Sequence, residues 1–305
     1  MKIDLDKLKN IEIDDVAVLT EYFEDNICMR SAFSPVNLFI WGTQFNAQFF
    51  FVDDKLVIYN KAWNCILLPC GSKFPPGVLR QISNTFYDAG MCGKVSFLDK
   101  AYIEEHQDEL VDFDVYVDRN NADYIYYAER LATLRGKKLA KKKNQISQFI
   151  RAYPDHIVSD LTSRDLDECF ELAEKWVSDH HRQHPGYKYE KNALRLAFDN
   201  FGRLKMKGKK IHVGDNMIAF SLCTELNKDT AIVHFEKFDR EIKGVSQLIN
   251  REMAQMIADN YLYINREEDM GIEQLRKAKK SYQPLAILDS YILERKKDNN
   301  QEVGA

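Results

Sequence analysis

Residues 265–284 read NREEDMGIEQLRKAKKSYQP, a stretch in which an acidic cluster is followed by a basic helical pattern. Four side chains recur at i, i+3, i+4 and i+7, the spacing of one helix face: Leu275, Ala278, Lys279 and Tyr282. This spacing predicts a short helix over 271–282 and places Lys279 beside the apolar stripe instead of on the solvated face. Arg276 and Lys280 lie one turn apart, and such a like-charged pair costs roughly a few tenths of a kcal/mol. An anion bound between them would remove that cost.

Three carboxylates, Glu267, Glu268 and Asp269, come just before this predicted helix. Acidic side chains at a helix N-terminus cap free N–H groups and complement the positive end of the helix dipole, which is a purely structural role. Capping does not account for the basic side chains that follow. Two interpretations of residues 265–284 therefore stay open, helix capping and a ligand site that uses both signs of charge.

Strand and helix patterns alternate along the whole chain. In the first half, strands are predicted at 47–52, 55–59, 64–68 and 94–98, and helices at 77–88 and from about 134 to 151. In the second half, helices are predicted at 166–177, 192–204, 245–257 and 271–282, and strands at 210–213, 216–224, 230–238, 261–264 and 286–294. Each half reads helix, antiparallel strands, helix, strand, helix, strand, with a break at Pro154 and a joint at 155–160. We therefore predict an α+β protein of two similar domains, residues 1–154 and 155–305.

The segment 265–284 resembles a motif of the phosphatidylglycerol lysyltransferase C-terminal domain family, which runs N-R-E-x-D-x-G and then L-R-x-A-K-x-S-Y-x-P. The segments LRGKKLAKKKN at 134–144 and LPCG at 68–71 are similar to two further blocks of that family. The resemblance implies two acetyltransferase-like (GNAT) domains in tandem, each a mixed, mainly antiparallel sheet flanked by helices. It also implies kinship with enzymes that pass aminoacyl groups from tRNA to lipids or peptides. The sequence departs from the motif at Gln274, where the family has a glycine, and at Lys143, where it has an arginine.

The composition is typical of a globular protein with a packed core, since 45% of the 305 residues are hydrophobic and 30% are charged. No stretch approaches the roughly 18 apolar residues of a membrane span, and the N-terminus has no signal-peptide core. The lysyltransferases carry a membrane-spanning part that is absent from this sequence, which argues against a lipid acceptor but leaves peripheral membrane contact open.

The six cysteines form no CxxC pair, so we expect reduced thiols and a cytoplasmic location.

The net charge of −4 conceals a strongly uneven distribution of charges. Residues 130–151 contain eight basic and no acidic side chains, and residues 202–210 contain five basic and no acidic ones, whereas 99–123 carries nine acids against two bases. Basic runs are most often solvated helix faces, but two of them together favour a shared anionic partner such as tRNA. Tyrosines at 124, 126 and 127 could stack on bases, although core packing explains them equally well.

The strand predicted at 230–238 places His234 and Glu236 on one face, where they could act as a general base and its orienting carboxylate. A half-exposed polar strand edge is the structural alternative. The loop that follows holds a single glycine, Gly244, and the opposing charge of Glu241. Because a pyrophosphate-binding turn needs more glycine and no carboxylate, acetyl-CoA is the less favoured donor.

A metal site is not predicted. His180 and His184 could share a helix face, with His181 between them, but no HExxH pattern or nearby ligand cluster completes a site.

We therefore expect an acyltransferase that moves an aminoacyl group, delivered on tRNA, to an amine or hydroxyl acceptor. The expected catalytic residues are His234, Glu236 and Asp269. The expected substrate-binding residues are Asn265, Glu268, Arg276, Lys279 and Tyr282, with Arg276 and Lys279 holding the anionic carrier or the developing oxyanion. The residues expected to bind tRNA are Arg135, Lys137, Lys142, Lys143 and Asn144. The alternatives are an acetyl-CoA-dependent N-acyltransferase and a non-catalytic binding module with the same fold.

Overall fold

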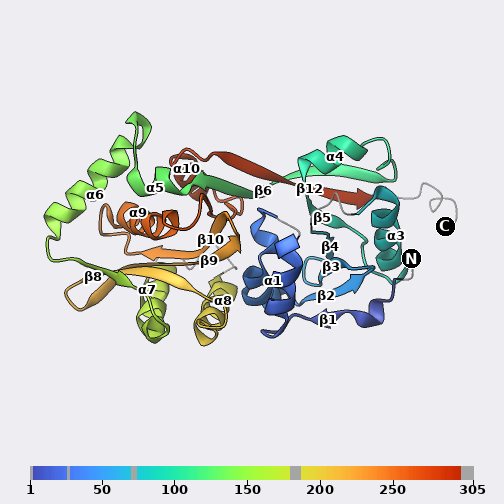
Figure 1. Cartoon of the computed structure of the whole chain (residues 1–305), viewed down its shortest axis with the longest axis horizontal. Coiled ribbons are helices and arrows are strands. Elements are labelled where there is room, and N and C mark those ends of the chain that lie inside the picture. The colour runs from blue at the N-terminus through green and yellow to red at the C-terminus, as the bar shows by residue number, and fades with distance from the viewer. Residues whose placement is uncertain (1–2, 26–27, 70–73, 179–186, 297–305) are drawn as a thin grey trace.

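The computed structural model describes residues 3–25, 28–69, 74–178 and 187–296, and it contains one twelve-stranded sheet flanked by helices (Figure 1). In the order in which they lie side by side, the strands are β1 (Lys9–Asn10), β2 (Ala47–Val52), β3 (Lys55–Asn60), β4 (Cys65–Leu67), β5 (Val95–Leu98), β12 (Ala286–Arg295), β6 (Phe113–Tyr127), β11 (Tyr263–Asn265), β10 (Thr230–Phe238), β9 (Asn216–Asn227), β8 (Lys207–Val213) and β7 (Ile157–Asp160). Neighbours are antiparallel except at β4–β5 and β10–β11, which are parallel. The predicted α+β fold with a mainly antiparallel sheet is therefore confirmed.

Ten α-helices within the described residues cover this sheet. They are α1 (Asp15–Asp25), α2 (Pro35–Ile40), α3 (Pro76–Asp88), α4 (Lys100–His106), α5 (Ala128–Thr133), α6 (Ala140–Ala152), α7 (Leu166–Ser178), α8 (Tyr187–Asp199), α9 (Val245–Ala258) and α10 (Glu273–Lys280). Two 3-10 turns, η2 (Ser31–Phe33) and η3 (Gly42–Phe45), flank α2. In Figure 1, α9 lies on one side of β9 and β10, whereas α7 and α8 lie on the other.

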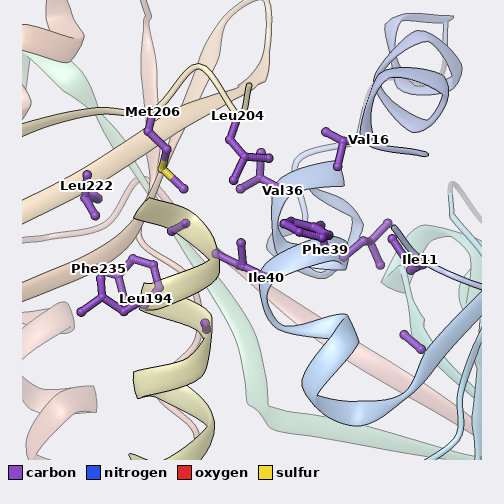
Figure 2. Packing of buried hydrophobic residues seen from close by; sticks show 14 of the residues in the cluster. Ile11, Val16, Val36, Phe39, Ile40, Leu194, Leu204, Met206, Leu222 and Phe235 are labelled. Atoms are coloured by element: carbon purple, nitrogen blue, oxygen red, sulfur yellow. The ribbon is translucent and has the colours of Figure 1, made fainter. Parts of the chain in front are cut away.

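The two halves of the chain share their core. Helix α2 contributes Val36, Phe39 and Ile40 to one apolar cluster, to which Leu194 of α8 and Phe235 of β10 also belong. In Figure 2, Ile40 lies toward Leu194 and Phe235, whereas Phe39 lies on the side of Ile11. All six side chains are less than a tenth exposed and belong to one cluster. Burial of a side chain of this size is worth about 1.5–3 kcal/mol, so this cluster is a substantial link between the halves.

The last strand of the sheet in sequence, β12, lies between β5 and β6. Strand β6 is long enough to pair with β12 over much of its length and with β11 at its end, where Ile125 lies opposite Asn265. The buried guanidinium of Arg30 fixes this junction, because it donates to the carbonyl of Asp289 at 2.7 Å and pairs with Asp99. The chain therefore crosses between its two halves at the centre of one continuous sheet, and the domain division at residue 154 stays a prediction.

Several predicted elements need correction. The basic helix expected from about 134 to 151 begins only at Ala140, as α6. The separate helix α5 ends at Thr133, and Gly136 at φ 102° lies between the two. The joint expected at 155–160 contains β7, which pairs with β8 at the edge of the sheet. No part of β6 was predicted as a strand, because residues 114–117 are exposed and lack the alternation of a half-buried strand, and the buried tyrosine-rich part that follows also lacks it.

No helix in the described part of the chain is long and apolar enough to cross a membrane. The histidines considered as metal ligands, at 180, 181 and 184, lie outside the described residues, as do Cys70 and Gly71 of the LPCG segment.

Candidate functional site

The loop after β11 carries the acidic part of the 265–284 motif into the centre of the molecule. Asn265 at its start is fully buried, and its side-chain amide donates to the carbonyl of Met29 at 2.7 Å and to Asp123 Oδ1 at 3.1 Å. Its side-chain oxygen accepts from the backbone N–H of Glu267 at 2.6 Å. Glu267 itself has φ 56°, a left-handed conformation that is costly for a side chain other than glycine. Asn265 therefore holds the loop in a strained turn beneath the carboxylates.

Three carboxylates, Asp123, Glu267 and Glu268, meet in this turn. Glu268 Oε1 accepts from the hydroxyl of Ser31 at 2.8 Å, and Glu267 Oε1 accepts from the side chain of Asn37 at 2.8 Å. Burial, followed by the charges of Asp123 and Glu267, raises the pKa of Glu268 to about 8, and burial likewise raises the pKa of Asp123. A carboxyl group with so high a pKa can give and take a proton near neutral pH.

The ammonium group of Lys279 lies in the same cluster. Its Nζ donates to the carbonyl of Arg266 at 2.6 Å and to the carbonyl of Glu268, and the residue is 7% exposed. Burial, followed by the charge of Arg266, lowers the pKa of Lys279 to about 8. The helix spacing had placed Lys279 beside the apolar stripe of α10, and the structure places it in the interior beside the motif carboxylates.

Asp269 occupies a separate and fully paired position. Its buried carboxylate accepts two hydrogen bonds from Arg276, both at 2.8 Å, and one from the hydroxyl of Tyr124 at 2.6 Å. Burial alone would raise the pKa of Asp269, but the hydrogen bonds from Arg276 and Tyr124 outweigh it and lower the pKa to about 2. The assignment of Asp269 as a proton handler is therefore corrected, because the group stays ionised at neutral pH. Arg276 is likewise committed to an internal ion pair instead of a free anion site.

The acidic cluster also does not cap α10. The residue at the N-cap position is Ile272, which makes no side-chain capping hydrogen bond. The capping interpretation of Glu267 and Glu268 is therefore wrong, and their hydrogen bonds go to Asn37 and Ser31 instead.

His234 and Glu236 bond to different partners. A β-bulge between Val233 and Phe235 interrupts the period of two that placed both side chains on one face. The His234 ring nitrogens bond to Thr224 and Asn37, each at 2.7 Å, with Glu267 Oε1 at 3.4 Å from Nδ1. Glu236 instead pairs with Arg266 at 2.9 Å, away from this network. His234 thus joins the carboxylate cluster, and Glu236 balances a buried guanidinium.

The basic helix α6 reaches the site at one residue. Lys142 Nζ lies 4.3 Å from the ring centre of buried Tyr282, and the guanidinium carbon of Arg266 lies 5.3 Å from the same ring. Burial, followed by the charges of Arg266 and Lys141, lowers the pKa of Lys142. The other residues expected to bind tRNA are exposed on the surface: Arg135, Lys137, Lys143 and Asn144. Arg135 pairs with Glu129 at 3.5 Å, whereas the exposed lysines of α6 and of the turn before it present their charge to solvent.

The second basic stretch, 202–210, is largely neutralised. Three of its side chains pair with carboxylates: Arg203 with Asp14, Lys209 with Asp160 and Lys210 with Asp165. The two exposed lysines at 205 and 207 carry the charge that is left. This stretch therefore offers a weaker anion surface than α6.

The sequence did not single out several residues of the site: Arg30, Ser31, Asn37, Asp123, Thr224 and Arg266. They come from η2, α2, β6, β9 and the loops beside them, which meet only in the folded chain. The signal that could have identified Asp123 is its place beside the apolar and tyrosine-rich run 124–127, where a buried carboxylate without a partner is costly. No cluster of three or more metal-ligating side chains occurs among the residues that the structure describes.

Comparisons with known structures agree with this architecture. A protein of unknown function from Bacteroides thetaiotaomicron VPI-5482 superposes with a TM-score of 0.86 at 33% identity, covering 95% of this chain and 99% of that one. L-PGS from Bacillus licheniformis gives a TM-score of 0.67 at 13% identity over 96% of this chain and 94% of its own. FemX gives 0.56 at 7% identity, covering 93% of this chain and 96% of that chain. The last two likenesses concern the fold alone.

Sequence comparison identifies a relative and a family. An uncharacterized protein of Mycoplasmoides gallisepticum is 25% identical over 181 residues, and the match spans 58% of this chain and 57% of that relative. The profile of the family described as "Phosphatidylglycerol lysyltransferase, C-terminal" matches residues 29–294, which include η2, the motif loop and nearly all of β12. The chain therefore belongs to the phosphatidylglycerol lysyltransferase C-terminal family.

Proposed function

We propose that this chain transfers an aminoacyl group from a tRNA-type donor to an amine or hydroxyl acceptor, with Glu268 as the group that accepts the acceptor's proton. Family and fold support an acyltransferase of the aminoacyl-transfer type. The assignment of Glu268 rests on the environment of its carboxyl group. That group lies in a cluster built on the family motif, and its pKa is raised to about 8.

The proposed reaction needs one proton acceptor and one centre of positive charge. The acceptor's nitrogen or oxygen loses a proton to Glu268 and forms a bond to the aminoacyl carbonyl carbon. The ester bond to the tRNA ribose then breaks, and the released hydroxyl group takes the proton back. The ammonium of Lys279, held by the carbonyls of Arg266 and Glu268, supplies positive charge where the carbonyl oxygen becomes negative.

The surface of α6 supports an RNA-linked donor. Lys141 and Lys143 of α6 are exposed, and the ammonium of Lys142 between them lies against Tyr282 of the motif. A polyanion bound along α6 would therefore have its end near the carboxylate cluster. Positive charge without acidic neighbours is the pattern that binds a phosphate backbone.

The loop before α9 supports acetyl-CoA less well. Gly244 has φ 93°, and a Cβ atom at this position would collide with the backbone of Gln145 and with Phe149. The glycine thus allows close packing of α9 against α6, and this use leaves it unavailable for a phosphate-binding turn. Thermal stabilisation by acetyl-CoA, with none by charged tRNA, would favour the coenzyme instead.

The test of this proposal is the variant Glu268→Gln, assayed for aminoacyl transfer from charged tRNA to a panel of amines and alcohols. Loss of a general base costs about 10²–10⁴-fold in rate. The native rate should peak near pH 8, because it needs the ionised carboxylate of Glu268, which forms as pH rises, and the charged ammonium of Lys279, which is lost as pH rises. The rising acid side of this profile should vanish in Glu268→Gln. The matched control is Glu273→Gln, since Glu273 lies exposed on α10. Unchanged transfer by Glu268→Gln would refute the assignment.

A further inference from the structure

Helix α2 of the first half of the chain carries one polar side chain into the carboxylate cluster of the second half. Asn37 is buried, and its neighbours Val36 and Leu38 pack into the apolar core. The Asn37 amide nitrogen donates to the carbonyl of Ser31 at 3.2 Å and to Glu267 Oε1 at 2.8 Å. Its Oδ1 lies 2.7 Å from Nδ1 of His234. An amide with partners on both of its polar atoms is fixed in one orientation.

The orientation of this amide assigns the proton of His234. The carbonyl of Ser31 and the carboxylate of Glu267 only accept, so the amide nitrogen must face them and the amide oxygen must face the ring. An amide oxygen also only accepts, so Nδ1 of His234 carries a hydrogen and donates it to Asn37. On the other side of the ring, Nε2 lies 2.7 Å from the hydroxyl of Thr224.

The hydroxyl of Thr224 completes the network with a neutral ring. Among the residues that the structure describes, Nε2 of His234 is the only hydrogen-bond partner of this hydroxyl. The hydroxyl can donate its hydrogen to Nε2 when that nitrogen carries none, and every polar atom around the ring is then paired. A second ring proton would leave the hydroxyl hydrogen without an acceptor. The geometry therefore favours the neutral ring with its hydrogen on Nδ1.

Asn37 also separates His234 from Glu267. Nδ1 lies 3.4 Å from Glu267 Oε1, the same oxygen that accepts from Asn37 at 2.8 Å. A carboxylate beside an imidazole favours the charged ring, because an opposite charge stabilises the protonated form. The amide satisfies both groups at shorter distances, so neither needs that extra proton. Glu267 thus keeps its negative charge within the cluster.

The charge of Glu267 acts on Glu268. After burial and the charge of Asp123, it is the next cause that raises the pKa of Glu268 to about 8. The other charged groups around these carboxylates come from the neighbouring elements and the motif loop: Asp123 of β6, Lys279 of α10, Arg30 before η2 and Arg266 of the loop. These groups do not bond to the side chain of Asn37, so replacing Asn37 alters the balance at His234 and Glu267 alone.

We propose that Asn37 is a positioning residue, which holds His234 neutral and thereby keeps the negative charge of Glu267 beside the general base Glu268. With both ring nitrogens engaged and the side chain fully buried, His234 supports the carboxylates instead of taking a proton from the substrate. The first half of the chain thus contributes to the reaction without touching the substrate. The role rests on the proposed function of Glu268, but the charge of His234 can be measured without turnover.

The test is Asn37→Leu, which is close in size and removes both polar atoms of the amide. Among the described residues, Nδ1 of His234 then faces only Glu267 Oε1, at 3.4 Å, so the ring should take up a proton and form an ion pair. Nitrogen-15 NMR of the ring at pH 7 should change from the neutral to the imidazolium signature. In the transfer assay, the midpoint of the acid side of the pH profile should move down by roughly one unit or more, because the imidazolium offsets the charge of Glu267.

The comparison variant is Thr224→Val, which removes the other hydrogen bond to the same ring. A proton on Nε2 would then face an apolar side chain, so the ring should stay neutral and the acid-side midpoint should stay native. Adding His234→Gln to Asn37→Leu should move the midpoint back up, because no ring is left to carry the charge. If Asn37→Leu does not fold, as judged by thermal unfolding, Asn37→Ala makes the same test.

A neutral ring in Asn37→Leu at pH 7 would overturn the proposal. So would a charged ring that leaves the acid-side midpoint where it is in the native chain. The catalytic assignment fails separately. If Glu268→Gln transfers at the native rate while Asn37→Leu charges the ring, Glu268 is not the base, and the hold of Asn37 on His234 stands.

Discussion

At the scale of single residues, the acidic motif contains two carboxyl groups with opposite properties. Glu268 and Asp269 are neighbours in sequence, yet the pKa of one is raised to about 8 and that of the other is lowered to about 2. The difference comes from their partners, because Glu268 meets Asp123 and Glu267 whereas Asp269 meets Arg276 and Tyr124. We infer that Glu268 performs chemistry and that Asp269 fixes α10 against β6.

The ion pair of Asp269 with Arg276 should make the free energy of unfolding depend on pH. Since the folded pKa lies below the ordinary value of 3.8, the pair stabilises the protein above about pH 4, and this contribution is lost as pH falls toward 2. Asp269→Asn should lower the free energy of unfolding at pH 7 by about 1.5–3 kcal/mol, because the buried side chain at 269 loses the charge that strengthens its hydrogen bonds from Arg276 and Tyr124. Urea denaturation at pH 7 and pH 3 measures the difference, which should shrink at the lower pH.

The control for this prediction is Glu273→Gln. Its carboxylate pairs only with Lys277 one turn along the exposed face of α10, so the variant should change stability by less than about 0.5 kcal/mol. An Asp269→Asn variant as stable as this control would show that the buried pair contributes nothing.

At the scale of elements, α6 and the stretch 202–210 show that a run of basic residues in a sequence does not by itself predict a positively charged surface. Both runs lack acidic residues along the chain. In the fold, Arg203, Lys209 and Lys210 meet carboxylates from other elements, whereas the lysines of α6 remain exposed apart from Lys142. The two runs should therefore differ in their affinity for RNA.

Because the lysines of α6 are more exposed than the basic side chains of 202–210, we expect tRNA binding to depend more on α6. Replacing Lys141 and Lys143 by glutamate should weaken the binding of tRNA and reduce the slope of log affinity against log salt by about one for each phosphate that the variant no longer neutralises. Gel-shift titrations at several salt concentrations measure both quantities. The comparison variant replaces Lys205 and Lys207, and an equal loss in the two variants would contradict a specific role of α6.

The elements also show what the sequence could predict. The sequence patterns identified β10, which is an almost continuously buried apolar run, and α10, whose helical spacing gives it one apolar side. The same reasoning missed β6, whose first part is mostly exposed and whose last part is buried on both faces, and it could not foresee the bulge that separates His234 from Glu236. Within the site, the motif identified Glu268 and Lys279, but Ser31, Asn37 and Asp123 come from distant segments. Only tertiary contacts bring them to the motif, so no local pattern reports them.

At the scale of the whole molecule, the two halves of the chain complete one sheet together. Strand β12 fills the gap between β5 and β6, and Arg30 binds the carbonyls of Leu288 and Asp289 from the side of η2. Leu293 of β12 is fully buried in the core beneath α3. The first half thus depends on a strand from the opposite end of the described chain.

A fragment of residues 1–154 should therefore fail to fold by itself. Without β12, the exposed edge of β5 and the side chains that pack on Leu293 remain uncovered, and an unpaired apolar edge promotes aggregation. Circular dichroism and thermal unfolding of the fragment measure this, with the full chain as control and a single cooperative transition expected there. A fragment that melts cooperatively would show that the first half is an independent domain.

The position of β12 also has a consequence for synthesis on the ribosome. Strand β5 ends at Leu98, but the strand that covers its edge begins only at Ala286. At about 5–20 residues per second, the interval between the two is on the order of 10–40 s. Throughout that time the nascent first half presents an open β-edge and an incomplete apolar core. The cell must keep this intermediate from associating with other chains, so the sheet order makes the protein's yield depend on its rate of translation and on chaperone capture.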